Sequence, residues 1–448
     1  MPADLLARLL TDLPAAVRAV DSGAVTSFDL VEAALERAAA WEPRIHAFAW
    51  LDPARARRLA SDADRARMRG AALGPLHGVP IALKDIIDTA GVPTENGTAL
   101  HRGRVPERSA EAALAVERAG AIVLGKTVTT ECAYFHPGPT RNPWNPERTP
   151  GGSSMGSAAA VAAGIVPAAV GSQTSGSVIR PATFCGVVGF KPSYSRIPIT
   201  GVLPFAPTLD TLGTFARSVE GAAWLAAVLA GDAPDAWAPL QGAAAAEMAA
   251  PRFAVVRLSD WEAAQPAMRE RFEADVAALR AAGAAVETPP PPEGLEEARW
   301  VQRTIMAYEG ARGLGPMFAQ APSLASAALR ALVNEGESIP PVVYETALRD
   351  RERLIDAFAA WIEPYDAVLT IPTLGEAPSP ETTGDPRANA RWTLLGVPAV
   401  TLPTGLGPSG LPLGLQIVGA PGDDRRLLAV AAWAEQRRPA PGAPALPR

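Results

Sequence analysis

The chain alternates between helical and strand-like hydrophobic patterns. Residues 27–41 repeat apolar side chains at helical spacing, and Ser27 is the expected N-cap of that amphipathic helix. Residues 74–87 form an apolar run bounded by proline and glycine, which is typical of a buried strand. A helical pattern at residues 110–119 and a strand-like run at residues 121–126 follow. This alternation predicts an α/β protein.

The middle and carboxyl-terminal parts add more elements of both kinds. The run at residues 154–164 is almost entirely serine, glycine and alanine, which predicts a helix packed tightly on every side. Residues 173–177 are expected to form a turn before a short helix, and the proline run at 289–292 an extended connector. Further strands are expected at 167–171, 368–371, 399–402 and 413–418, and further helices at 55–69, 268–279 and 425–436.

Composition is that of a soluble globular chain. Hydrophobic residues make up 48% and charged residues 20% of the 448 positions, which is enough apolar surface for a substantial core. The formal charge of −6 supplies no global attraction for phosphate backbones, so we expect no nucleic-acid partner.

No targeting or membrane-spanning segment is expected. The first 20 residues carry Asp4 and Asp12 among apolar positions and do not match a signal peptide. The longest apolar stretch, residues 158–170, is interrupted by glycine and proline and is too short to cross a bilayer. We therefore expect no membrane partner and a cytoplasmic location. Cys132 and Cys185 lack the spacing of a disulfide framework or zinc site, so buried free thiols are expected, with no metal and no other cofactor.

Lysine is rare in this sequence. Only three of the 41 Lys and Arg residues are lysines, namely Lys84, Lys126 and Lys191. Arginine stays protonated in proteins, whereas burial can convert lysine to a neutral amine. The three lysines are therefore candidates for roles that arginine cannot fill, and the alternative for each is a packing role.

Several motifs occur in a distinctive order along the chain. They include GPLHGVPIALKD with Lys84, GGSSMGSAAAVAAG with Ser153, and GSQTSGSVIRP with Ser177. GKTVTTECAYFHPGPTRNPWN, CGVVGFKPS and, more loosely, GVPAVTLPTGLGPSGLPLGLQIVG accompany them. In this combination the sequence closely resembles the amidase-signature family over most of its length apart from residues 215–360.

The resemblance implies a fold, a domain division and a catalytic triad. The expected fold is a large mixed, twisted β-sheet covered by helices on both sides. The expected division is an N-terminal helical region at residues 1–70 and one α/β domain at residues 71–448, with a peripheral variable subregion at about 215–360. In the triad, Ser177 is the nucleophile and Lys84 accepts its proton. Ser153, whose preceding peptide bond is expected to be cis, relays the proton between them.

Chemistry supports these roles. A serine hydroxyl is a weak nucleophile until a base removes its proton, and a buried neutral lysine can be that base. Because a hydroxyl both donates and accepts, Ser153 can pass the proton from Ser177 to Lys84. The backbone N–H groups of Thr174, Ser175, Gly176 and Ser177 are the expected oxyanion hole, since they follow one another at a helix start.

Other site residues are expected around this triad. Ser154 and Ser172 are expected to hydrogen-bond to Lys84 and the loop, or else to cap backbone groups. The sequence departs from the commoner family residues with Gln173 in place of aspartate, and with Ser175 and Met155 in place of glycine. The glutamine form of the loop looks most like the malonamidase-type branch.

In that branch, the arginine that matches Arg180 contacts a substrate carboxylate. A purely structural role for Arg180 is the alternative. Tyr134 is a further expected substrate contact, and Asp210 fits a structural carboxylate. The expected partner is a small-molecule amide or carbamate substrate, so the expected activities include that of a urethanase. A homodimer is a further option for the assembly.

Three other interpretations compete with a free-standing amidase. GSSMG matches a nucleophile elbow centred on Ser154, but all four histidines precede it, which contradicts the chain order of that mechanism. Residues 120–127 formally match a phosphate-binding GxxxxGKT loop, although the intervening AIVL is strand-like. The third alternative is the amidase component of a tRNA-dependent amidotransferase, which shares the signature but works with a partner.

Overall fold

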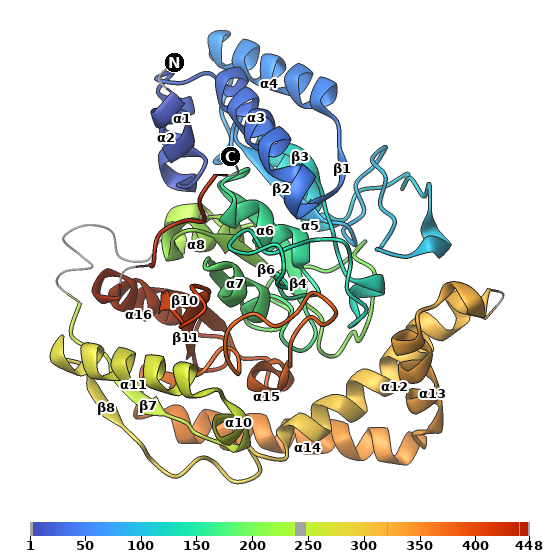
Figure 1. The fold of residues 1–448 in the computed structure, drawn as a ribbon, viewed down its shortest axis with the longest axis vertical. Helices are drawn as coiled ribbons and strands as arrows, with labels where there is room; N and C mark the ends of the chain where they lie inside the picture. Colours follow the sequence, from blue (N-terminus) through green and yellow to red (C-terminus); the bar gives the residue numbers. More distant parts are fainter. Residues whose placement is uncertain (1–2, 238–247, 320, 439, 447–448) are drawn as a thin grey trace.

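One mixed β-sheet organises the molecule. The computed structural model describes residues 3–237, 248–319, 321–438 and 440–446, and the strands of this part form one eleven-stranded sheet in the order β1-β3-β2-β4-β6-β5-β10-β11-β9-β7-β8 (Figure 1). The strands are β1 Phe48–Leu51, β2 Pro80–Lys84, β3 Ile122–Thr127, β4 Ala168–Gln173, β5 Val188–Lys191, β6 Thr211–Ala216, β7 Arg252–Val255, β8 Ala285–Glu287, β9 Ala367–Thr370, β10 Ala399–Leu406 and β11 Pro412–Val418. The predicted α/β fold with a large mixed sheet is confirmed.

Helices surround the sheet. They are α1 Ala3–Leu9, α2 Leu13–Asp21, α3 Ser27–Ile45, α4 Pro53–Met68, α5 Glu111–Arg118, α6 Met155–Ala162, α7 Ile179–Cys185, α8 Val219–Leu229, α10 Ser259–Ala263, α11 Pro266–Ala281, α12 Ala298–Phe318, α13 Ala327–Ser338, α14 Pro341–Ile362, α15 Arg387–Leu394 and α16 Asp424–Arg437. None of the described helices is both long and apolar enough to cross a membrane.

Both faces of the sheet are covered, as neighbouring residues of β6 show. Successive residues of a strand point to opposite faces. A side chain added at Gly213 would lie 2.9 Å from Val178, just before α7, whereas the hydroxyl of Thr214 donates to the carbonyl of Ala222 in α8. Helices α6 and α7 therefore lie on one face, and α8, with α16 packed against it, lies on the other.

Strand β2 lies between two parallel neighbours. It pairs with β3 on one side and β4 on the other, and all five of its residues are buried. A continuous apolar run suits such a strand because both of its faces are covered. Its last residue, Lys84, is thereby placed in the interior.

Helix α6 is buried along its full length. All eight residues are buried, and the backbone approaches its neighbours closely, since a Cβ at Gly156 would lie 2.0 Å from the carbonyl oxygen of Ala47. Small side chains make this approach sterically accessible.

The N-terminal region and the predicted variable subregion also contribute strands. Residues 1–70 supply β1 as well as helices, and the range 215–360 supplies β7 and β8 at one edge of the sheet. Helices α12, α13 and α14 form an arm to one side of the sheet (Figure 1). The domain division itself stays a prediction.

One local prediction is wrong. Helix α3 begins at Ser27 itself, and its N-cap is Thr26, whose backbone is extended and whose hydroxyl accepts a hydrogen bond from the backbone N–H of Asp29 at 3.0 Å. Two adjacent hydroxyl residues offer equivalent capping chemistry, and the backbone conformation decides between them.

Candidate active site

Lys84 is a buried amine at the carboxyl end of β2. Its side chain is fully inaccessible to solvent, and burial lowers its pKa from the ordinary value near 10.5 to about 7. The negative charge of Asp210 acts in the opposite direction and raises the pKa of Lys84 by a smaller amount. Desolvation disfavours the charged form of an amine. Lys84 can therefore exchange a proton near neutral pH.

Two serine hydroxyls accept hydrogen bonds from Lys84. Its Nζ lies 2.7 Å from Ser153 Oγ and 2.8 Å from Ser172 Oγ. Ser153 follows a cis peptide bond from Gly152 and precedes α6, whereas Ser172 belongs to β4, the strand beside β2. Ser154 makes no hydrogen bond to Lys84; its hydroxyl instead exchanges hydrogen bonds of 3.2 Å with the backbone of Ser172.

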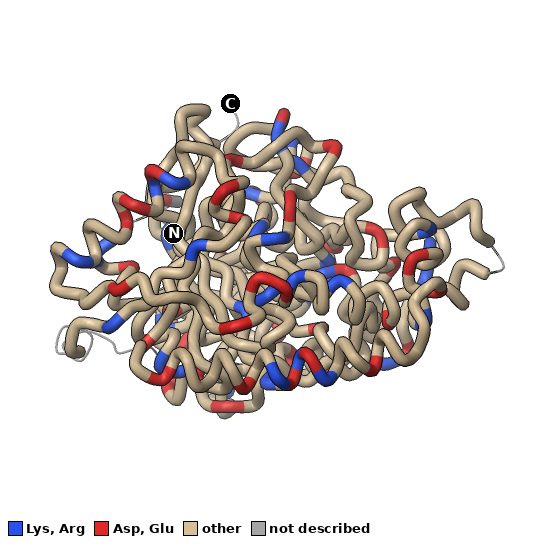
Figure 2. Tube along the Cα trace, turned by 90° about the horizontal axis from the view of Figure 1, so that it is seen from below, with Lys and Arg blue, Asp and Glu red and all other residues tan. Residues whose placement is uncertain are grey.

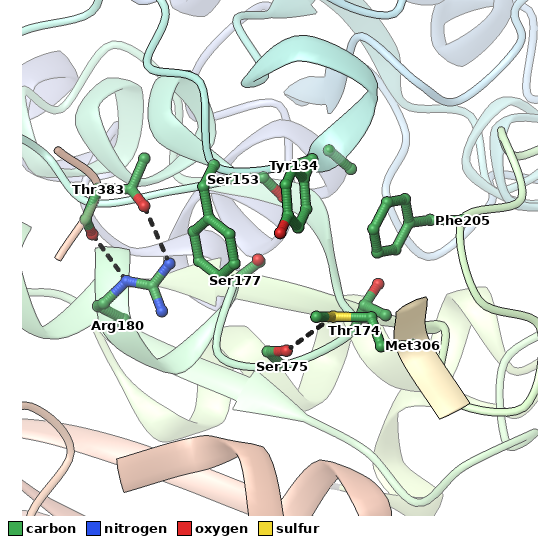
Figure 3. Close-up of a pocket in the computed structure, with 11 residues that line it drawn as sticks. Tyr134, Ser153, Thr174, Ser175, Ser177, Arg180, Phe205, Met306 and Thr383 are labelled. Atoms are coloured by element: carbon green, nitrogen blue, oxygen red, sulfur yellow. Dashed lines mark hydrogen bonds between the residues drawn. The ribbon is translucent and has the colours of Figure 1, made fainter. Parts of the chain in front are cut away.

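Ser177 lies in the turn between β4 and α7. Its side chain and that of Ser153 line the same cavity, where Figure 3 shows them near each other. The hydroxyl of Ser177 makes no hydrogen bond to any other described residue. It is therefore free to approach a substrate carbonyl.

The cavity above Ser177 is narrow. Its volume is about 10 Å³, which is room for about one water molecule. Aromatic and thioether groups of Tyr134, Phe205 and Met306 form one side, and Arg180 and Thr383 form another (Figure 3).

Consecutive backbone donors are available beside Ser177. The N–H groups of Ser175, Gly176 and Ser177 donate to no other group within the described part of the chain. A side chain at Gly176 would lie 2.5 Å from Asn389 Oδ1 and 2.9 Å from a terminal nitrogen of Arg180, so a larger residue would have to displace these two side chains. These free donors match the requirement of an oxyanion hole.

Side chains fix this loop from several directions. Thr174 Oγ1 donates to Asp210 Oδ1 at 2.5 Å, and the other oxygen of Asp210 accepts from two backbone N–H groups. Burial raises the pKa of Asp210 to about 6, although these hydrogen bonds act to lower it. Gln173 Oε1 accepts from the N–H groups of Val178 and Ile179 at 2.8 and 3.1 Å. The glutamine thus connects the end of β4 to the start of α7.

Arg180 combines structural contacts with one free group. Its Nε donates to Thr383 O at 2.7 Å, and one terminal nitrogen donates to Gly152 O at 2.7 Å. The other terminal nitrogen, Nη1, is buried and has no partner among the described residues. Burial lowers the pKa of Arg180 to about 10, so the guanidinium stays charged at neutral pH.

Tyr134 is buried in the cavity wall. Its ring stacks on Phe205 with centroids 5.6 Å apart, and its hydroxyl accepts a hydrogen bond from Arg303 at 2.9 Å. Arg303 also pairs with Glu335.

Several lining residues have no signal in the sequence motifs. Phe205, Met306 and Thr383 lie outside the motifs quoted above, and only the folded chain brings them to Ser177. An apolar residue in a helix such as α12 looks like any core residue.

The lysine of the GKT segment at residues 120–127 forms its hydrogen bonds inside the protein. Lys126 is fully buried in β3, and its Nζ donates to the carbonyl of Ile87 and to Thr94 Oγ1. The amine is therefore engaged within the protein core.

Known proteins with similar sequences and structures identify the family. The Amidase family matches residues 29–428. A glutamyl-tRNA(Gln) amidotransferase subunit from Acidothermus cellulolyticus is 34% identical, with 96% of this chain and 94% of that protein covered. The corresponding protein of a Synechococcus strain is 34% identical over 93% of this chain and 94% of its own length.

Solved structures agree with this relationship. A crystal structure of an amidase is 35% identical with a TM-score of 0.87, covering 95% of this chain and 100% of that one. A peptide amidase from Stenotrophomonas maltophilia is 29% identical with a TM-score of 0.83, covering 97% and 98%. This chain belongs to the amidase-signature family.

These relatives contradict the expectation of no nucleic-acid partner. The relatives from Acidothermus and Synechococcus are named for a tRNA, so the exclusion drawn from net charge is wrong. A formal charge of −6 describes the whole chain and not a local surface or an assembly. Figure 2 shows basic and acidic positions interspersed along the chain.

Replacing Lys84 with arginine tests the base. Lys84→Arg retains a cation but cannot lose its proton, so kcat/KM is expected to fall by roughly 100-fold or more. In the wild type, kcat/KM is expected to rise with pH through about 7 and then level, because a lysine must lose its proton before it can act as the expected base. The measurement is a pH–rate profile.

His136→Asn is the matched control for that profile. His136 is exposed and lies two residues from Tyr134 in the cavity wall. We expect its replacement to leave the rise near pH 7 in place. Loss of the rise in His136→Asn, or robust activity in Lys84→Arg, contradicts the assignment of Lys84.

Proposed function

We propose that this chain hydrolyses an amide C–N bond by nucleophilic catalysis with Ser177, Ser153 and Lys84. The observation that carries the proposal is the buried amine of Lys84, 2.7 Å from Ser153 Oγ, in the same site as the unpaired hydroxyl of Ser177. A lysine with a pKa of about 7 is basic enough to accept a proton and is partly neutral at physiological pH.

The reaction has two halves. Ser177 Oγ bonds to the carbonyl carbon while its proton passes through Ser153 to Lys84, and the carbonyl oxygen becomes an oxyanion. The N–H groups of the loop at residues 174–177 stabilise this charge. Ser153 then delivers the proton to the leaving nitrogen, the C–N bond breaks, and an acyl-enzyme remains. Water attacks the acyl-enzyme, releases the acid and restores Ser177.

We also propose that the acyl part of the substrate is small and carries a carboxylate. The narrow cavity favours a small group, and Arg180 Nη1 is a buried cationic donor without a partner in the described part of the chain. A carboxylate would supply the missing acceptor through a charge-assisted hydrogen bond. Amides are the main candidates, and carbamates present the same carbonyl to Ser177.

A second candidate is the amidase component of a tRNA-dependent amidotransferase. The named curated relatives support this candidate better than a free-standing enzyme, since they are proteins of that kind and are covered almost completely. Both candidates use the same acyl-enzyme chemistry. They differ in whether the chain acts without partners.

Assaying the isolated chain separates the two candidates. We expect a fluorophosphonate to label the wild type at Ser177 and not to label Ser177→Ala, because only the nucleophilic oxygen is lost. Ammonia release from malonamate, malonamide and glutamine is measured in parallel. Turnover by the isolated chain indicates a free-standing amidase, whereas labelling without turnover indicates a component of a larger complex. Labelling of Ser177→Ala contradicts the proposed nucleophile.

Arg180→Ala tests the carboxylate contact. Malonamate and malonamide form a matched anionic and neutral pair. We expect the ratio of kcat/KM for malonamate to that for malonamide to fall about tenfold or more, because one charge-assisted hydrogen bond is removed. Loss of the contacts to Gly152 and Thr383 affects both substrates alike. Equal losses for the two substrates therefore contradict the carboxylate contact and favour a structural role.

A further inference from the structure

Gln302 of α12 reaches the loop at residues 174–177, the oxyanion loop of the proposed reaction. Its side chain is only 3% exposed, and its Nε2 donates to Thr174 O at 2.9 Å and to Ser175 Oγ at 2.7 Å. Ser175 Oγ in turn donates to Met306 Sδ at 3.3 Å, as Figure 3 shows. One amide group of the helical arm therefore contacts two adjacent residues of the loop.

Peptide geometry connects these contacts to the N–H donors. The carbonyl oxygen of one residue and the N–H of the next belong to one planar trans unit and point in opposite directions. Fixing Thr174 O therefore fixes the direction of the Ser175 N–H. The Ser175 N–H is one of the donors that have no partner among the described residues.

The next peptide is oriented in the same way. Thr393 Oγ1 donates to Ser175 O at 2.6 Å, which fixes the direction of the Gly176 N–H. Gln173 Nε2 donates to the same threonine oxygen at 3.0 Å. The two residues by which the loop departs from the commoner family sequence, Gln173 and Ser175, thus each contact a side chain from a distant segment.

We propose that Gln302 is a positioning residue that orients the Ser175 N–H for oxyanion stabilisation through its hydrogen bonds to Thr174 O and Ser175 Oγ. This inference rests on the proposed acyl-enzyme chemistry. Gln302 does not line the cavity, so it acts through the loop and not on the substrate. Preorganised donors accelerate acyl transfer because they need no reorientation as charge develops.

The chain offers a matched control on the same helix. Glu309 accepts hydrogen bonds from the backbone N–H of Thr208 at 2.9 Å and from the hydroxyl of Tyr344 at 2.7 Å. These contacts anchor α12 to the segment before Asp210 and to α14, and neither partner belongs to the loop at residues 174–177. Glu309→Gln therefore weakens the attachment of α12 but leaves the Gln302 contacts in place.

The experiment measures the second-order rate of fluorophosphonate labelling at Ser177 in the full chain. Gln302→Met keeps the side-chain length and removes the donors, and Gln302→Asn keeps the amide but shortens its reach. We expect both variants to be labelled about tenfold or more slowly than the wild type, because the oxyanion donors lose their preorganisation. The midpoint of the pH dependence is expected to stay near 7, because Lys84 is unchanged.

Glu309→Gln is expected to label within about twofold of the wild type, since it leaves the loop contacts in place. Circular dichroism and thermal unfolding identify any variant that fails to fold, and Gln302→Asn tests the proposal if Gln302→Met is such a variant. Wild-type labelling rates in a folded Gln302 variant overturn the proposal. So does an equal loss in Glu309→Gln, which would indicate general docking of α12. Failure of the wild type to be labelled at Ser177 refutes the proposed function instead.

Discussion

Desolvation of Lys84 is the constraint on which the rest of the site depends. An amine is a useful base at neutral pH only if its charged form is destabilised, and burial at the end of β2 lowers its pKa to about 7. That burial requires parallel neighbours on both sides of β2 and the closely packed, small-residue helix α6. The hydroxyls of Ser153 and Ser172 satisfy the amine without adding a countercharge. An arginine could not fill the proposed role of Lys84 because its guanidinium does not lose a proton.

The oxyanion loop depends on contacts over long sequence distances. Asp210 contacts Thr174, Gln302 contacts Thr174 and Ser175, and Thr393 contacts Ser175. The signature motifs thus supply the proposed reacting groups, whereas Asp210, α12 and α15 supply the contacts that orient the loop. The same arm supplies Met306 to the cavity wall, so α12 contributes both to that wall and to the geometry of the loop.

Local patterns are sufficient for part of this structure. The apolar run ending at Lys84 and the small-residue run of α6 predict β2 and α6, because burial on all sides leaves a direct signature in composition. The predicted N-cap of α3 is wrong by one residue, since Thr26 and Ser27 have the same capping chemistry. Gln302 and Thr383 carry no such signature, because ordinary polar residues acquire a role only through contacts made on folding. Net charge likewise gives no valid exclusion of a tRNA-linked partner.

The ability of Lys84 to become neutral near pH 7 is the central claim, and the rarity of lysine in this chain allows a direct measurement. Only Lys84, Lys126 and Lys191 would carry label in a ¹⁵N-lysine sample. Titrating the Nζ resonances by NMR, with Lys84→Met to assign the signal, reports the pKa of Lys84 in the folded protein. We expect a midpoint at about 7 for the Lys84 amine. A Lys84 resonance that stays in the ammonium form up to about pH 10, as in an unperturbed lysine, would contradict this claim.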